Sequence, residues 1–196
     1  MSYLYTGEEG AFLLKLARSE MENHLGISRD HQGDFPGKTH CRHSEALGEK
    51  RGVFVTLHGK PDGALRGCIG SITAQRSVEE GVRINAVNAA FKDPRFSPLA
   101  RGELDQVLLE ISILTEPQQL DAAYGDALLS KVRPFLDGVI LEKGGKGATF
   151  LPQVWEQLPD PAAFFSHLCA KAGLDRNAWK KKGLTVSTYQ VQSFEE

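Results

Sequence analysis

Apolar and polar residues alternate with two different periods along the chain, and each change of period marks a new element. The first region has helical spacing over residues 8–24, carried by Phe12, Leu13, Leu16, Ala17 and Met21. Two strand-like runs follow, GVFVTLH at 52–58 and ALRGCIGSI at 64–72, with the turn-forming GKPDG between them. The pattern therefore predicts an amphipathic helix and then a β-hairpin.

The next segment changes back to helical spacing. Ser77 followed by Glu80 is a capping-box signature, which predicts a helix from there to about Phe91. Pro94 disfavours helical backbone at Asp93, so residues 92–99 are predicted to form an ordered loop. A buried strand is then expected over 107–114, interrupted by the polar residues Glu110 and Ser112.

The second half of the chain repeats this order. It predicts a short helix at 126–133, a hairpin, a helix opening at Asp160-Pro161 and a final strand at 184–194. The hairpin pairs 137–142 with 148–152 across the turn KGGKG. Both halves thus show hairpin, helix and strand, which suggests an internal duplication.

These connections indicate an α+β protein. Its sheet should be mainly antiparallel, with flanking helices, and could close into a barrel. We expect one domain over residues 1–196. It divides into an N-terminal helix and variable loop (1–50), a first half (51–120) and a second half (121–196).

Composition narrows the class of function without naming one. The chain has 196 residues and a formal net charge of −2, which does not favour nucleic-acid binding; its basic block is Lys180–Lys182. No run of about 18 apolar residues predicts a membrane span. The three cysteines include no CxxC pair, which favours reduced thiols in the cytoplasm and gives no zinc-finger pattern. Neither GxGxxG nor a phosphate-binding loop indicates a nucleotide cofactor.

The candidate chemistry lies in LRGCIG, residues 65–70. Residues two apart in a strand share a face, so Arg66, Cys68 and Gly70 should project together, while Leu65 and Ile69 face the core. Gly67 and Gly70 lack a Cβ atom and should leave space beside the thiol. An arginine nearby favours a thiolate, so Cys68 is the candidate catalytic residue.

Structural explanations compete with this interpretation. Cysteine often packs as a small apolar side chain, and strand glycines often mark only curvature. Arg66 needs a carboxylate or a ligand anion, and Glu110 is its best internal partner by pattern. Asp93 should fix its loop, with Arg95 directed towards the hairpin or paired with Asp93 alone. The candidate binding residues are Arg66, Gly67, Gly70, Asp93 and Arg95, and no metal ligands are assigned.

The amino-acid sequences of these segments resemble those of the AMMECR domain family. The matching stretches are GVFVTL (52–57), LRGCIG (65–70), DPRFSPL (93–99), EISIL (110–114), DGVIL (137–141) and ATFLPQVWEQLPDPAAF (148–164). They are most similar to bacterial members called AmmeMemoRadiSam system protein A. The resemblance implies a larger and a smaller lobe with a cleft near LRGCIG. It also implies Memo-like and radical SAM partners. The segment HCRH at 40–43 matches no motif of the family.

Three functions remain open. The first is a component that binds a small molecule or peptide, with a small anionic ligand as one candidate, and acts with those two partners. The second is an enzyme in which Cys68 is nucleophile or thiol carrier beside Arg66 and Arg95; neither His58 nor His167 stands out as its general base. The third, a nucleic-acid-associated factor, is opposed by the charge balance.

Overall fold

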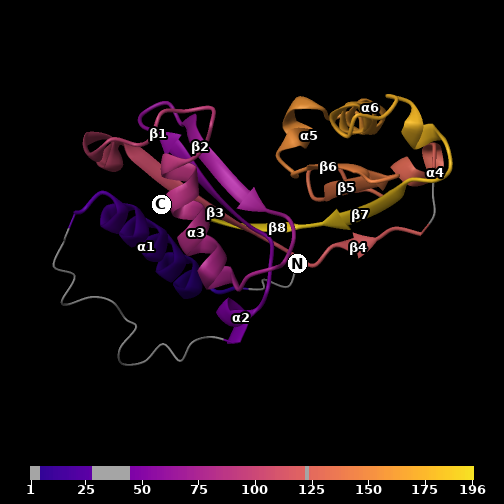
Figure 1. The fold of residues 1–196 in the computed structure, drawn as a ribbon. Coiled ribbons are helices and arrows are strands. Elements are labelled where there is room, and N and C mark those ends of the chain that lie inside the picture. The colour runs from indigo at the N-terminus through magenta and orange to yellow at the C-terminus, as the bar shows by residue number, and fades with distance from the viewer. Residues whose placement is uncertain (1–4, 28–44, 122–123) are drawn as a thin grey trace. The chain divides into compact units, whose positions relative to one another are not determined.

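The computed structural model describes residues 5–27, 45–121 and 124–196, and the chain forms two compact units (Figure 1). The first unit contains Met1–Leu114 and Gln192–Glu196, and the second contains Thr115–Val191. The class is α+β, as predicted. The prediction that the sheet could close into a barrel is wrong. The described strands form two separate sheets of four, and neither closes on itself. No described helix has the length and apolar character to cross a membrane.

In the first unit, the sheet has the strand order β2-β1-β3-β8. Its strands are β1 (Val53–Gly59), β2 (Ala64–Ser71), β3 (Val107–Leu114) and β8 (Val191–Glu195). β1 pairs antiparallel with both β2 and β3, which confirms the first predicted hairpin. Val53, Val55 and Leu57 of β1 are buried, and the residues between them are partly exposed, so one face of the sheet forms the core.

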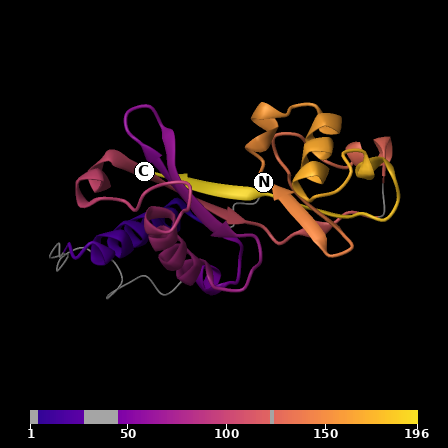
Figure 2. The same cartoon turned by 45° about the horizontal axis from the view of Figure 1, so that its top comes forward.

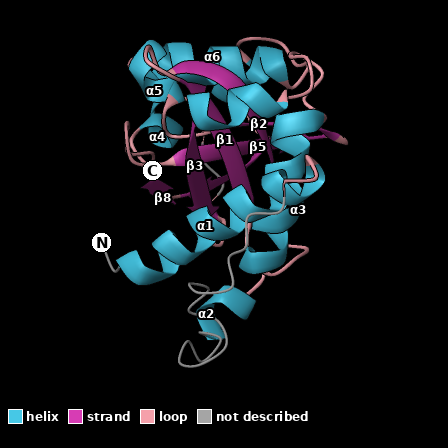
Figure 3. Cartoon of the chain, turned by 90° about the vertical axis from the view of Figure 1, so that its left-hand side faces the viewer, coloured by secondary structure: helices cyan, strands magenta, loops and turns pink. Residues whose placement is uncertain are grey.

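Two helices cover that core face. They are α1 (Gly7–His24) and α3 (Val78–Phe91), which lie side by side in Figures 1 and 2 and in front of the strands in Figure 3. α1 begins with a full capping box between Thr6 and Glu9. α3 begins at Ser77, whose hydroxyl accepts a hydrogen bond from Glu80 N, at the predicted place. A short helix, α2 (Glu45–Gly48), and the 3₁₀ turn η1 (Arg101–Gln106) complete the unit.

In the second unit, the sheet has the strand order β4-β7-β5-β6. Its strands are β4 (Gln118–Gln119), β5 (Gly138–Lys143), β6 (Lys146–Phe150) and β7 (Thr185–Tyr189), with β5 and β6 forming the second predicted hairpin. Its helices are α4 (Asp126–Leu129), α5 (Val154–Gln157), α6 (Pro161–Lys171) and the 3₁₀ turn η2 (Ala178–Lys180). Trp155 stacks on Phe164 with ring centroids 3.6 Å apart in its core.

The two sheets have the same strand order, and the fourth strand of each sheet follows in the chain directly after the third strand of the other sheet. In each unit a hairpin leads through a helix to a third strand that pairs beside the hairpin's first strand. After β3 the chain continues into β4 of the second sheet, and after β7 it returns as β8 of the first. The single final strand predicted for 184–194 is therefore wrong: it is two strands in different sheets, divided at Gln190.

Candidate functional site

A β-bulge in β2 sets the directions of the LRGCIG side chains. Leu57 pairs with Gly67 and His58 pairs with Leu65, so Arg66 is the extra residue between the two pairs. Cys68 pairs with Thr56, away from the helices, on what we call the outer face of the first sheet. Ile69 packs against the core as expected, but Leu65 is 43% exposed. The bulge, which shifts Leu65 into register with His58, is the reason that this part of the prediction is wrong.

Gly67 and Gly70 do not leave open space beside the thiol. A Cβ atom on Gly67 would lie 2.2 Å from the carbonyl oxygen of Ala89 in α3. On Gly70 it would lie 2.2 Å from Cγ of Phe54. Both glycines are therefore needed for close packing, one by the helix and one by an aromatic ring. The expectation of open space beside the thiol is therefore wrong, and the assignment of the two glycines as ligand-binding residues stays a prediction.

The loop after α3 holds the backbone of Cys68. Asp93 Oδ2 accepts a hydrogen bond from Cys68 N (2.9 Å), and Arg95 Nη2 donates to Cys68 O (3.2 Å). Asp93 also accepts from the backbone N and the Nε of Arg95 through Oδ1, and from Nη2 through Oδ2. Asp93 and Arg95 thus pair with each other and also hydrogen-bond to the backbone of the hairpin. This joins the two alternatives that the sequence left open.

This arrangement, which we call the Asp93–Arg95 clamp, has consequences for charge and for the sheet edge. The Asp93 side chain is only 2% exposed, whereas that of Arg95 is 54% exposed. Hydrogen bonds from Arg95, and then from Cys68 N, lower the pKa of Asp93 well below its ordinary value, against the opposing effect of burial. Because β2 is an edge strand, the clamp also occupies backbone groups that another strand could otherwise pair with.

Arg66 is paired, but not with Glu110. Its Nε and Nη2 donate to the two carboxylate oxygens of Glu103, each at 3.1 Å. These bonds lower the pKa of Glu103. The predicted Arg66–Glu110 pair is therefore wrong, because the bulge redirects Arg66 and η1 supplies the carboxylate. Both arginines lie near the ring of Phe96, whose centroid is 6.0 Å from Arg66 Cζ and 5.5 Å from Arg95 Cζ.

A polar row crosses the outer face from Cys68. Thr56 pairs with Cys68 on one side and with Glu110 on the other. The Thr56 hydroxyl donates to Cys68 Sγ at 3.3 Å. Glu110 Oε1 accepts from the hydroxyls of Ser112 (3.1 Å) and Ser193 (3.3 Å). Polar side chains from all four strands therefore form one connected surface, which we call the outer-face network.

His58 belongs to this network, and the sequence did not single it out. Its Nδ1 donates to the carbonyl oxygen of Gly63 at 3.2 Å, since a carbonyl can only accept. Its Nε2 lies 3.1 Å from Glu110 Oε2. Both ring nitrogens are therefore engaged. Alternation could have indicated this contact, because His58 and Glu110 occupy polar positions in predicted strands, but only the pairing register brings them together.

The remaining candidate groups are easily placed. Cys169 is fully buried in the second unit, and burial raises the pKa of its thiol. Among the described residues, no group of three or more histidine, cysteine or carboxylate side chains could hold a metal ion. The HCRH segment lies outside the described residues.

Cys68→Ser is expected to change the free energy of unfolding by no more than about 1 kcal/mol. The Cys68 thiol is partly exposed and accepts a hydrogen bond from the Thr56 hydroxyl. A serine hydroxyl at position 68 can accept the same hydrogen bond. Urea unfolding measures the change. Cys169→Ser is the matched control: it places a hydroxyl in a closed core and should cost about 1–3 kcal/mol. A larger loss for Cys68→Ser than for Cys169→Ser would mean that the Cys68 thiol is structural.

The fold and this site define a two-unit α+β protein with a partly exposed cysteine, whose backbone is held by the Asp93–Arg95 clamp, on the face of the first sheet that α1 and α3 do not cover. The profile of the AMMECR1 family matches residues 14–194. The chain belongs to the AMMECR1 family, as the motifs predicted.

Its relatives cover almost the whole chain. A protein of Methanocaldococcus jannaschii is 37% identical over 194 residues, which are 98% of this chain and 92% of that protein. A protein of Thermofilum pendens is 37% identical over 202 residues, with 97% and 91% covered. The crystal structure of an uncharacterized protein from Pyrococcus horikoshii matches with a TM-score of 0.83 and 34% identity, covering 99% of this chain and 94% of that one.

Proposed function

We propose that this protein is a binding component that presents its outer-face network to a small-molecule or peptide ligand. We further propose that it acts together with a Memo-like protein and a radical SAM protein. The ligand site centres on Cys68, whose backbone is held by the Asp93–Arg95 clamp. The exposed Arg95 guanidinium beside it favours a ligand with an anionic group. The partners are suggested by the resemblance to AmmeMemoRadiSam system proteins.

One observation favours binding over catalysis. Both nitrogens of His58 are engaged, by Gly63 O and by Glu110, whereas the Cys68 thiol contacts the Thr56 hydroxyl, so His58 is not placed to take the Cys68 proton. Glu110 itself accepts hydrogen bonds from Ser112 and Ser193 and is in contact with His58 Nε2. The network is thus satisfied internally, as in a preorganised binding surface.

The enzyme alternative has its own supporting observation. His58 and Glu110 lie on the same face as Cys68: His58 is two residues after Thr56 in β1, and Glu110 pairs with Thr56 from β3. A rearrangement of His58 on ligand binding could then release a base for the thiol. In this alternative Cys68 is a nucleophile or thiol carrier.

Partner binding is tested with purified proteins. The Memo-like and radical SAM proteins of the same organism are titrated with this chain by calorimetry. Leu65→Arg, on the outer face, should weaken the interaction at least about tenfold. Tyr124→Arg is the matched control, because Tyr124 is 44% exposed and lies in the second unit. Lack of binding to both proteins, or an equal effect of the two variants, would contradict the proposal.

Iodoacetamide labelling of Cys68 separates binding from catalysis. The binding function predicts that Cys68 is labelled no faster than a thiol that has no neighbouring base. A His58→Gln variant should then label like the wild type. Rapid labelling near pH 6 that His58→Gln abolishes would support the enzyme instead. Cys169→Ser removes labelling of the second described thiol.

A further inference from the structure

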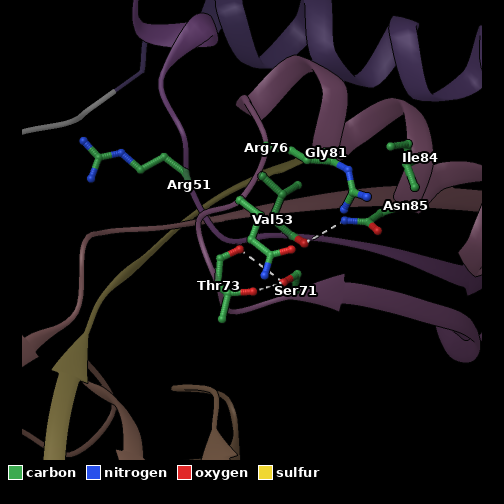
Figure 4. A pocket seen from close by; sticks show the side chains of 9 residues that line it. Arg51, Val53, Ser71, Thr73, Arg76, Gly81, Ile84 and Asn85 are labelled. Carbon is green, nitrogen blue, oxygen red and sulfur yellow. Dashed lines mark hydrogen bonds between the residues drawn. The ribbon is translucent and has the colours of Figure 1, made fainter.

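A second polar site lies on the opposite side of β2 from Cys68. It is a pocket at the start of β1 and the end of β2, against the first turns of α3 (Figure 4). Ser71 pairs with the buried Val53, so its side chain faces the helices. The pocket is small and partly open to solvent, and it is lined by Arg51, Val53, Ser71, Thr73, Gln75, Arg76, Gly81, Ile84 and Asn85.

The hydroxyl groups of this pocket are held in place but retain a proton for a ligand. Ser71 Oγ lies 3.2 Å from the carbonyl oxygen of Thr73 and 2.8 Å from its Oγ1. When Ser71 donates to the carbonyl, the Thr73 hydroxyl proton can turn to a ligand without leaving Ser71 unsatisfied. Asn85 Nδ2 donates to Val53 O at 2.9 Å, which fixes the amide at the pocket wall.

Arg76 supplies a positive charge that is only loosely engaged. Its side chain is 51% exposed, and its Nε lies 3.8 Å from Glu80 Oε1, a long contact between exposed side chains that salt screens readily. In Figure 4 it extends over Gly81 towards Asn85. Arg51 differs, because it points away from the pocket and binds Glu49 at 2.6 Å. Arg51 therefore adds only a positive electrostatic potential near the pocket, whereas Arg76 can donate hydrogen bonds to a ligand.

We propose that this pocket binds an oxyanion group, the phosphate or carboxylate of a small molecule. Arg76 makes the charged contact, and the Thr73 hydroxyl and Gln75 amide donate to the remaining oxygens. The argument rests on the number of donors that converge on one small pocket beside a weakly engaged guanidinium. The site is separate from the Cys68 site, because Ser71 and Cys68 face opposite sides of the same strand.

The test follows the backbone amide signals of residues 71–76 by NMR during titration with sodium phosphate, and separately with sodium acetate. Sodium chloride keeps the ionic strength constant. We expect saturable shifts with at least one oxyanion, and Arg76→Gln should weaken binding about tenfold or more. Saturation by phosphate alone or acetate alone identifies the oxyanion class.

Arg101→Gln is the control, because Arg101 is an exposed arginine that does not line the pocket. It should bind the oxyanion as the wild type does. Linear shifts with both anions would overturn the proposal, and so would equal affinities of the wild type and Arg76→Gln. Thr73→Val, which removes the hydroxyl but keeps the shape, should weaken binding even if Arg76→Gln proves unstable.

Discussion

Gly67→Ala is expected to lower the free energy of unfolding by about 3 kcal/mol, the upper end of the usual cost of overpacking. The added methyl group would lie 2.2 Å from the Ala89 carbonyl oxygen and 3.2 Å from its carbonyl carbon. These are backbone atoms of α3, so no side-chain rotation can relieve the contact. The helix or the hairpin must move, and both belong to the core of the first unit. Urea unfolding measures the loss.

Gly102→Ala provides the control for this change. A Cβ atom on Gly102 meets no atom within 4 Å, and its backbone is not in the left-handed region. The variant should therefore be neutral within about 0.5 kcal/mol. Equal stabilities of Gly67→Ala and Gly102→Ala would show that α3 can move aside at little cost. That result would contradict the conclusion that close packing requires a glycine at position 67.

The LRGCIG motif is largely explained by packing and backbone contacts. The missing side chain of Gly67 allows α3 to pack closely, and that of Gly70 allows the ring of Phe54 to do so. Arg66 binds Glu103. The Cys68 backbone is held by Asp93 and Arg95. The thiol of Cys68 is the part of the motif that these contacts do not require. A functional role for the motif therefore concentrates on this side chain and the outer-face network.

The sequence predicted both hairpins and the extent of α3, because local patterns determine them. Turn residues join the paired strands at 59–63, and a capping residue begins α3. The partner of Arg66 could not be predicted in this way. Alternation assigns each residue to a face, but a bulge shifts the assignment by one. Glu103 then reaches Arg66 from η1, whose position depends on the tertiary fold.

The exchange of fourth strands was also beyond the sequence pattern. The apolar residues Val186, Tyr189 and Val191 change the phase of the alternation near the end of β7, but a bulge within one strand would give the same pattern, so the sequence does not identify a change of sheet at Gln190. The choice of sheet depends on which edge is free for pairing. β8 completes the first sheet beside β3, and β4 completes the second beside β7.

Asp93→Asn is expected to lower the free energy of unfolding by about 2–4 kcal/mol. Oδ2 of Asp93 accepts from Cys68 N and Arg95 Nη2, and Oδ1 accepts from Arg95 N and Nε. An asparagine offers one acceptor oxygen and places an NH₂ group against the other two donors. The Cys68 amide should then exchange its hydrogen faster, which NMR detects residue by residue. Asp62→Asn, in the exposed hairpin turn, is the control and should cost little.

The same carboxylate predicts a pH dependence. The folded-state pKa of Asp93 lies below its ordinary value of 3.8, so in acid the unfolded chain binds more protons than the folded one. The stabilisation by Asp93 is therefore fully present above the unfolded pKa. It is lost progressively as the pH falls below about 4 towards the folded pKa. Stability measured from pH 6 to pH 2 should fall less steeply for Asp93→Asn than for the wild type. Parallel curves would mean that Asp93 is not held as an anion by Arg95 and Cys68 N, and the clamp would then have no electrostatic contribution.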